Sequence, residues 1–170
     1  MKFFHVEAND QIAQPRFIDW FNEMNPQQLV ARDISQISRF TVSLHAGAIF
    51  TDIISYPYFM ISDGFASLVS MYDESIQFRH VVLNDKENRR FMAYNIPLLE
   101  EIDCLSQESE LNRDGSVLLK TVLLREVVKG RSLFQIGGVK NRYVVSSLEL
   151  VESALRREAL GLKITEVPLV

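Results

Sequence analysis

Hydrophobic and polar positions are patterned most strongly over residues 58–83, where they predict a strand, a helix and a second strand. The run YFMI, residues 58–61, is compact and apolar, as in a buried strand. Apolar residues then recur at helical spacing from Phe65 to Tyr72. Ser62 stands where its side chain can accept from the free N–H groups at the start of that helix. The stretch SIQFRHVVL follows as a second strand.

A second unit of the same kind closes the chain. Residues 142–145 predict a strand, and Ser146 follows with Glu149 three residues later, which is the spacing of a capping box. An apolar helical stripe continues from there, and Gly161 suits the end of the helix. Residues 162–167 predict the closing strand. Ser146 is therefore a predicted helix cap.

The two units match in kind. YFMIS in the first corresponds to RYVVS in the second, and SIQFRHV to GLKITEV, although the spacing between the two ends differs by two residues. An internal duplication would produce this match, and so would chance, because strand, cap, helix and strand is a common order. Between the units, the apolar run from Val117 to Ile136 predicts a central hairpin. The polar residues 84–88 predict an exposed turn.

The predicted fold class is α+β, a mixed sheet with two strand-helix-strand units and a central hairpin. At 170 residues the chain is long enough for one ordinary core and short for two, so residues 1–170 are expected to form a single domain. The hydrophobic content of 47% is that of a globular protein. Residues 1–50 contain a short opening strand, predicted at residues 2–7, and are otherwise less regular in pattern.

The charge balance narrows the choice of partner. A net charge of -4 argues against a protein that binds nucleic acid phosphates through clustered Lys and Arg. The first residues lack the apolar region of a secretory signal, and no apolar run reaches the roughly 18 residues of a membrane span. A single cysteine allows no internal disulfide. A cytoplasmic protein that binds neither nucleic acid nor membrane is expected.

The only cysteine lies in EIDCLSQESE, residues 101–110, and its surroundings favour architecture over chemistry. A catalytic thiolate needs an electropositive neighbourhood. Cys104 instead has acidic neighbours, which raise the pKa of a thiol, and apolar flanks, which predict burial. Asp103 and Ser109 are expected to satisfy N–H groups of the adjacent loop. Catalysis by Cys104 is the less favoured alternative.

No catalytic, metal or cofactor site is predicted. His5, His45 and His80 are far apart, and none has a second ligand at the spacing of a zinc motif. The glycine pair in QIGG belongs to no phosphate-binding pattern and predicts a turn. Trp20 has phenylalanines nearby in the sequence and is either a core residue or an exposed anchor for a partner.

Three sequence features stand in a definite order between residues 55 and 167. They are Asp103-Cys104-Leu105 followed by Ser109 and Glu110, then Val145-Ser146 before a helix, then Gly161-Leu162 before Glu166-Val167. In this order they resemble the bacterial immunity proteins of polymorphic toxin systems, the immunity protein eleven type, formerly a domain of unknown function. Ser106 stands where that family more often has Asp. The resemblance implies an α+β protein without catalytic residues that neutralises a toxin made by the same cell.

The expected function is therefore to bind a cognate toxin domain and occlude its active site. The acidic net charge predicts a basic toxin, such as a nuclease domain. The candidate partner-binding residues are Glu100, Glu101, Glu108, Glu110 and Trp20. Two other functions stay open: a small enzyme with an unrecognised carboxylate or cysteine site, and a homo-oligomeric structural module.

Overall fold

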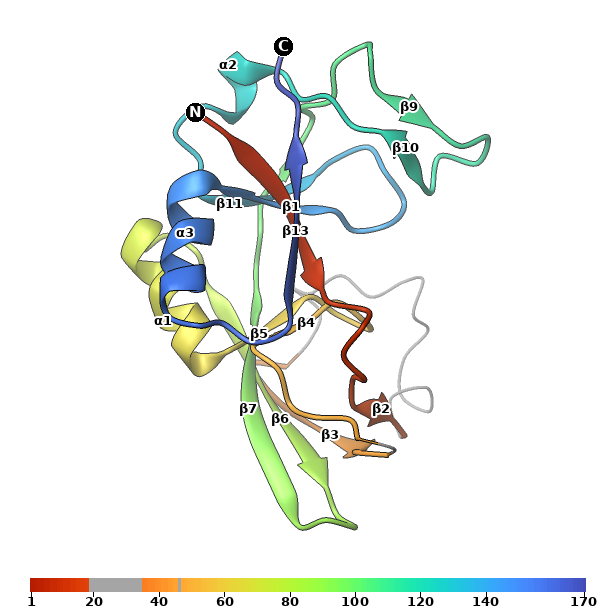
Figure 1. The fold of residues 1–170 in the computed structure, drawn as a ribbon, viewed down its shortest axis with the longest axis vertical. Helices are drawn as coiled ribbons and strands as arrows, with labels where there is room; N and C mark the ends of the chain where they lie inside the picture. The colour runs from red at the N-terminus through yellow and green to blue at the C-terminus, as the bar shows by residue number, and fades with distance from the viewer. Residues whose placement is uncertain (19–34, 46) are drawn as a thin grey trace.

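The computed structural model describes residues 1–18, 35–45 and 47–170. These residues form helices and mixed sheets, the α+β class that the sequence predicts (Figure 1). The helices are α1 (Asp63–Tyr72), α2 (Arg125–Val128) and α3 (Leu148–Arg156). The strands are β1 (Phe3–Ala8), β2 (Arg16–Phe17), β3 (Ile37–Ser43), β4 (Ile53–Ile54), β5 (Met60–Ser62), β6 (Phe78–Asp85), β7 (Arg90–Pro97), β8 (Glu101–Ile102), β9 (Glu110–Leu111), β10 (Leu118–Lys120), β11 (Leu133–Ile136), β12 (Val144–Ser147) and β13 (Leu162–Val167).

Two larger sheets and one small pair organise the strands. The six-stranded sheet has the order β2-β3-β6-β7-β5-β4, and the five-stranded sheet has the order β13-β1-β12-β11-β8. β9 and β10 form a separate antiparallel pair. Most neighbours are antiparallel, but β3 runs parallel to β6 and β8 runs parallel to β11. Both larger sheets are therefore mixed.

The first unit, made of β4, β5, α1, β6 and β7, forms largely as predicted. The Phe65 amide donates to the Ser62 side-chain oxygen at 3.3 Å, which confirms Ser62 as the cap of α1. Phe65, Leu68 and Val69 are buried, as their helical spacing predicts. Tyr72 is instead exposed at the last turn of α1, where its hydroxyl lies 2.6 Å from the hydroxyl of Ser153.

The second unit, made of β11, β12, α3, β13 and β1, corrects the predicted cap. Ser146 lies inside β12 and is buried, so it does not cap the helix. Ser147 caps α3, because its side-chain oxygen accepts from the Leu150 amide at 3.4 Å. Strand β12 ends two residues later than predicted, at Ser147, and the cap moves by one residue because two adjacent serines offer the same local capping chemistry. The closing strand, 162–167, is where the sequence predicts it.

Each unit places one strand between its two parallel strands. In the first unit β7 lies between β5 and β6 and is antiparallel to both. In the second unit β1 lies between β12 and β13 in the same way. The registers agree too: Tyr94 of β7 lies opposite the cap residue Ser62 and opposite Val81. Phe3 of β1 lies opposite the cap residue of α3 and opposite Val167. The two units share one topology.

The match extends to the flanking strands, and it is circularly permuted. β4 is antiparallel to β5 as β11 is to β12. β3 runs parallel to β6, and Leu123 forms a parallel bridge with Leu169 just after β13. The registers align SIQFRHV with GLKITEV as predicted, and YFMIS with YVVSS, one residue later than predicted. Since β1 begins the chain, the last strand of the second unit comes first in the sequence. An internal duplication would leave this arrangement.

The core has a shared part and a part for each unit. In the shared cluster Phe65 of α1 and Leu150 of α3 pack with side chains from both sheets, and the two helices lie side by side (Figure 1). A second cluster, around Leu83 and Tyr94, fills the other face of the six-stranded sheet. A third, around Phe3 and Phe134, fills the other face of the five-stranded sheet. The helices therefore join the units through one common apolar layer.

The predicted hairpin over residues 117–136 is wrong in its placement. β10 pairs with β9, the short helix α2 follows, and β11 pairs with β12 and β8. Leu123 and Val128 lie in the third cluster, so the apolar density that suggested strands comes from an irregular buried connection. The hairpins in the middle of the chain are β6–β7 and β9–β10.

The N-terminal part is more regular than its sequence pattern suggests. β1 confirms the predicted opening strand, and β2 and β3 also lie within residues 1–50. In the part of the chain that the structure describes, no helix has the length and apolar character needed to span a membrane.

Candidate functional site

The start of the segment EIDCLSQESE is hydrogen-bonded to strand β11 and to the glycine that follows it. The Gly137 amide donates to the Ile102 carbonyl at 2.8 Å. A Cβ at Gly137 would lie 3.2 Å from the carbonyl carbon and oxygen of Ile102, so the close approach of the two strands favours a glycine there. Ile102 and Cys104 both point into the third cluster. The segment is thus held as part of the five-stranded sheet and its core.

Cys104 is a packed core residue. Its side chain is 0% exposed, among apolar side chains such as Phe134 and Leu123. Burial, with a further contribution from the Asp103 charge, raises the pKa of the thiol to about 11. The thiol is therefore protonated at neutral pH, a state in which it is neither a nucleophile nor a metal ligand.

Ser109 and Asp103, predicted to act alike, behave differently. The Ser109 hydroxyl donates to the Val122 carbonyl at 2.8 Å and accepts from the Val122 amide at 3.0 Å. Asp103 is exposed, and within the described part of the chain its carboxylate accepts no hydrogen bond. It alternates with the buried Ile102 and Cys104, so it points outward. The predicted loop-binding role of Asp103 is wrong.

Ser106 does part of what was expected of Asp103. It is buried, and its hydroxyl accepts from the Glu108 amide at 3.2 Å. A serine bonding to the amide two residues later forms a local turn, and a Ser-x-Glu pattern at the start of a polar loop is the sequence signal for it.

The four predicted partner-binding glutamates fall into two pairs. Glu100 forms an ion pair with Arg131 at 2.6 Å, and Glu101 accepts from the Gln135 amide group at 3.0 Å. Glu108 and Glu110 are exposed, and Glu110 lies opposite Lys120 across the β9–β10 pair. Only the second pair is directed at solvent without a hydrogen bond in the described residues. The remaining candidate, Trp20, lies outside the described residues.

His80 takes part in a hydrogen-bonded chain that the sequence did not reveal. Its Nδ1 lies 2.7 Å from the Asn95 side-chain oxygen, and the Asn95 amide group donates to the Asp63 carboxylate at 2.7 Å. Because an amide oxygen only accepts, Nδ1 carries the hydrogen. The three residues come from β6, β7 and the first turn of α1, so no short motif could have linked them. The chain fixes the orientation of an exposed imidazole.

A polar pocket lies between the two units. Its volume is about 220 Å³, and its lining includes His5, Glu7, Ser55, Arg142 and Tyr143. Burial lowers the pKa of His5, so its ring is neutral at pH 7. That ring lies 5.3 Å from the Tyr143 ring, and the Arg142 guanidinium donates to a backbone carbonyl at 3.3 Å. The pocket combines both signs of charge and offers no thiol. Among the described residues no group of three or more His, Cys, Asp or Glu side chains could hold a metal ion.

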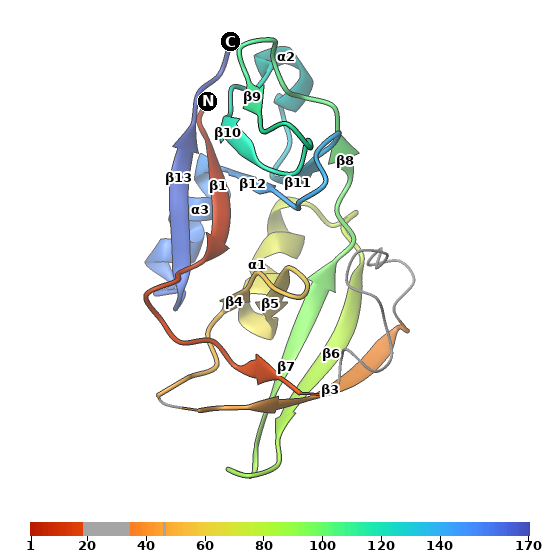
Figure 2. The ribbon, with the colours of Figure 1, turned by 90° about the vertical axis from the view of Figure 1, so that its right-hand side faces the viewer.

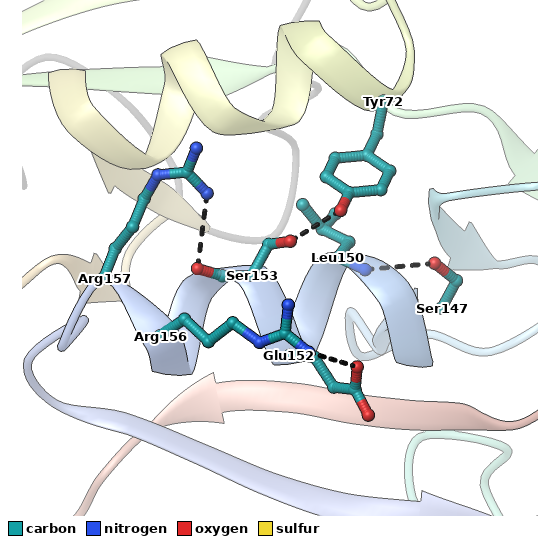
Figure 3. A network of polar contacts seen from close by, with 7 residues as sticks. All are labelled: Tyr72, Ser147, Leu150, Glu152, Ser153, Arg156 and Arg157. Carbon is teal, nitrogen blue, oxygen red and sulfur yellow. Dashed lines mark hydrogen bonds and ion pairs between the residues drawn. The ribbon is translucent and has the colours of Figure 1, made fainter.

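A smaller pocket of about 110 Å³ lies between α1 and α3. Figure 3 shows the polar contacts over this helix pair: the Tyr72 hydroxyl meets Ser153, and Arg157 donates to the Ser153 carbonyl at 3.4 Å. Arg156 and Glu152 form an i,i+4 ion pair at 3.5 Å. Of these contacts, the one between Tyr72 and Ser153 joins the two helices, and the other two lie within α3 and its C-terminal cap. The lining of the pocket includes the apolar Phe65 and Leu68. We interpret this pocket as a small gap in the packing between the two helices.

No protein-family model matches the chain, and a search of curated proteins finds no match. Membership of the immunity family therefore stays a prediction from the sequence motifs.

Proposed function

We propose that this protein is an immunity protein that binds a cognate toxin domain and neutralises it by occlusion, without catalysis. The family resemblance of residues 55–167 motivates the proposal. Occlusion needs a rigid shape with exposed contact residues and requires no reactive group.

The burial of Cys104 is the observation that carries this proposal. The Asp-Cys-Leu motif is the most chemically suggestive part of the resemblance, and its thiol is packed in the core with a raised pKa. Ser109 in the same motif bonds both backbone groups of Val122. Because the residues of this motif stabilise the fold, they support a binding protein over an enzyme that would use them for catalysis.

The enzyme alternative has little support at the residues first suspected. A catalytic Cys104 or Asp103 would need a pocket and a histidine within hydrogen-bond reach. Cys104 borders neither pocket described above, and Asp103 lies on the surface. His80 is held by Asn95 and not by either of them.

Growth rescue tests the proposed function. The C-terminal domain of the protein encoded immediately upstream is expressed with and without this chain, and the two proteins are purified together. Rescue of growth with a stable complex is expected. A toxic neighbour that is neither rescued nor bound would overturn the proposal.

The same assay tests the expected charge complementarity. Glu108→Lys with Glu110→Lys should weaken the complex and reduce its dependence on salt, because rim charges mainly steer association. Glu100→Gln serves as the matched control, since Glu100 already pairs with Arg131. Equal affinity of the double variant and the wild type would assign toxin binding to another surface.

A further inference from the structure

The β6–β7 hairpin extends beyond the helix that covers its base. β6 and β7 each have eight residues, and they pair along their whole length, from Phe78 opposite Pro97 to Asp85 opposite Arg90. Helix α1 begins at Asp63, which reaches the hairpin at Asn95. Beyond that point the hairpin and the adjoining strand β3 project as an arm at one end of the molecule (Figure 1, Figure 2).

One face of this arm points away from the second core cluster and becomes more exposed toward the hairpin tip, from the buried Asn95 at its base to the exposed Phe91. Three rows of residues run across β3, β6 and β7 and share that face, because residues opposite one another in a sheet point the same way. We call these nine residues the arm face: Ile37, His80 and Asn95; Arg39, Val82 and Ala93; Thr41, Asn84 and Phe91. The opposite face carries Phe40, Leu83 and Tyr94 into the second core cluster. The arm face is thus the outer side of a well-anchored sheet.

The arm face carries an exposed apolar side chain at each end and more positive than negative charge on the face and at the tip. Ile37 is 73% exposed and Phe91 is 76% exposed, and they lie at opposite corners of the face. Arg39 lies on the face itself, and Lys86 and Arg89 are exposed at the hairpin tip. In the described part of the chain none of these three cations has a carboxylate partner.

The opposite end of the molecule has the complementary character. We call the β8–β10 region, residues 100–120, the acidic end: it has six acidic and two basic side chains. Its exposed apolar side chains include Leu119, which is 67% exposed, and Leu111, which is 40% exposed and lies opposite Leu118 on the β9–β10 pair. In both views the β9–β10 pair and the arm lie at opposite ends (Figure 1, Figure 2).

We propose that the arm face of one copy of this protein docks on the acidic end of a second copy. In such a contact Ile37 and Phe91 meet exposed apolar side chains of the acidic end, and the cations of the arm meet its exposed carboxylates. The contact joins two different surfaces, so it is heterologous, and assembly continues until a ring closes or a chain extends. Nucleic acid fits the arm less well, because the face offers only the Phe91 ring and the His80 imidazole for stacking and the protein has a net charge of -4.

Charge reversal at both ends gives a decisive test. One variant carries Arg39→Glu and Arg89→Glu, which makes its arm acidic like its other end. A second carries Asp103→Lys, Glu108→Lys and Glu110→Lys, which changes its acidic end from six acidic and two basic side chains to three acidic and five basic ones, so that it is basic like its arm. Circular dichroism checks that both are folded, and sedimentation velocity is measured from about 10 to 200 µM at low salt. A labelled single-stranded DNA of about 20 nucleotides is the probe for nucleic acid binding.

The wild type should associate at low salt and dissociate at about 0.5 M salt. Each variant alone should sediment as a monomer, and an equimolar mixture of the two should associate again, because each arm then faces an end of opposite charge. A monomeric wild type, a variant that associates as the wild type does, or a mixture that stays monomeric would overturn the proposal. So would a monomer that binds the labelled DNA through Arg39 and Arg89.

Discussion

Asp85 is the residue whose environment differs most from its sequence pattern. It lies in a polar stretch predicted as an exposed turn, yet it is fully buried at the end of β6. Its carboxylate accepts from the side-chain amide of Asn88 at 2.6 Å and from the backbone amides of Glu87, Asn88 and Leu44. The exposed part of the turn is held from inside by this one side chain.

The pH dependence of Asp85 follows from these bonds. The Asn88 side chain, then the backbone amides, hold the pKa of Asp85 below its ordinary value, against the effect of burial. A lowered pKa stabilises the fold at pH values above that of the unfolded carboxyl, about 3.9, and the gain is lost as pH falls through the folded value. Asp85→Asn should therefore lower the free energy of unfolding at pH 7, and its deficit should shrink below about pH 4. Urea unfolding across that range measures this, with the exposed Glu87→Gln as control; a deficit independent of pH would contradict it.

The two adjacent serines of β12 allow the stabilising effect of helix capping to be measured apart from the effect of burying a hydroxyl. Ser147→Ala should lower the free energy of unfolding by about 1 kcal/mol, because the Leu150 amide at the start of α3 loses its acceptor. Ser146→Ala should cost less, since its hydroxyl makes only a 3.3 Å bond to the next carbonyl. Thermal unfolding of the two variants compares them directly. A larger loss of stability for Ser146→Ala than for Ser147→Ala would show that Ser146 is the cap.

At the scale of elements, the loop after β8 is fastened through Ser109. Ser109→Ala leaves both the amide and the carbonyl of Val122 without their side-chain partner, so a loss of about 1–3 kcal/mol in the free energy of unfolding is expected. Asp103→Ala, on the same segment but exposed, should change it by less than about 0.5 kcal/mol. Equal losses for the two variants would show that the segment is held in some other way.

Helices and strands that have a local signal in the sequence could be predicted, but the elements that they pair with or pack against could not. The apolar spacing of residues 65–69 specifies helix α1, because burial of one helix face imposes a period. The same apolar density between Val117 and Ile136 arises from an irregular connection packed on the core, which a pattern of burial cannot distinguish from strands. Cys104 was correctly predicted as buried from its apolar flanks. The chain from His80 to Asp63 depends on contacts between three distant elements, so no local signal exists for it.

At the scale of the whole molecule, Gly161 is where the second unit meets the first. A Cβ at Gly161 would lie 2.7 Å from the side chain of Thr51, and its φ is +81°. Gly130 has a similar φ of +78° with nothing within 4 Å. Gly130→Ala should cost about 1–2 kcal/mol from backbone strain, and Gly161→Ala about 1–3 kcal/mol more from the clash. Urea unfolding of both variants tests this; equal costs would mean that Thr51 yields freely.

The permuted match between the units predicts that the chain can be opened elsewhere. In the first unit a tight turn joins β6 to β7, and in the second the same place is occupied by the two termini, which lie close together (Figure 1). Joining Val170 to Met1 through about six Gly and Ser residues, and opening the chain between Asn88 and Arg89, should give a folded protein with a similar far-ultraviolet circular dichroism spectrum.

Opening the same closed chain after Tyr94 is the matched control. That break falls inside β7, in the middle of the six-stranded sheet, and should abolish cooperative unfolding. If the variant opened after Asn88 also fails to fold with linkers of several lengths, the β6–β7 turn and the junction between the two termini are not equivalent.

The position of β1 has a consequence for how the protein is made. β1 leaves the ribosome well before both of its neighbours, β12 and β13, which come from residues 144–167. The first unit, whose strands end at Pro97, can assemble long before synthesis ends. At about 5–20 residues per second, β1 waits roughly 10–30 s with both backbone edges unpaired. Every nascent copy therefore presents an unprotected strand to its neighbours on the same messenger RNA until residues 144–167 emerge.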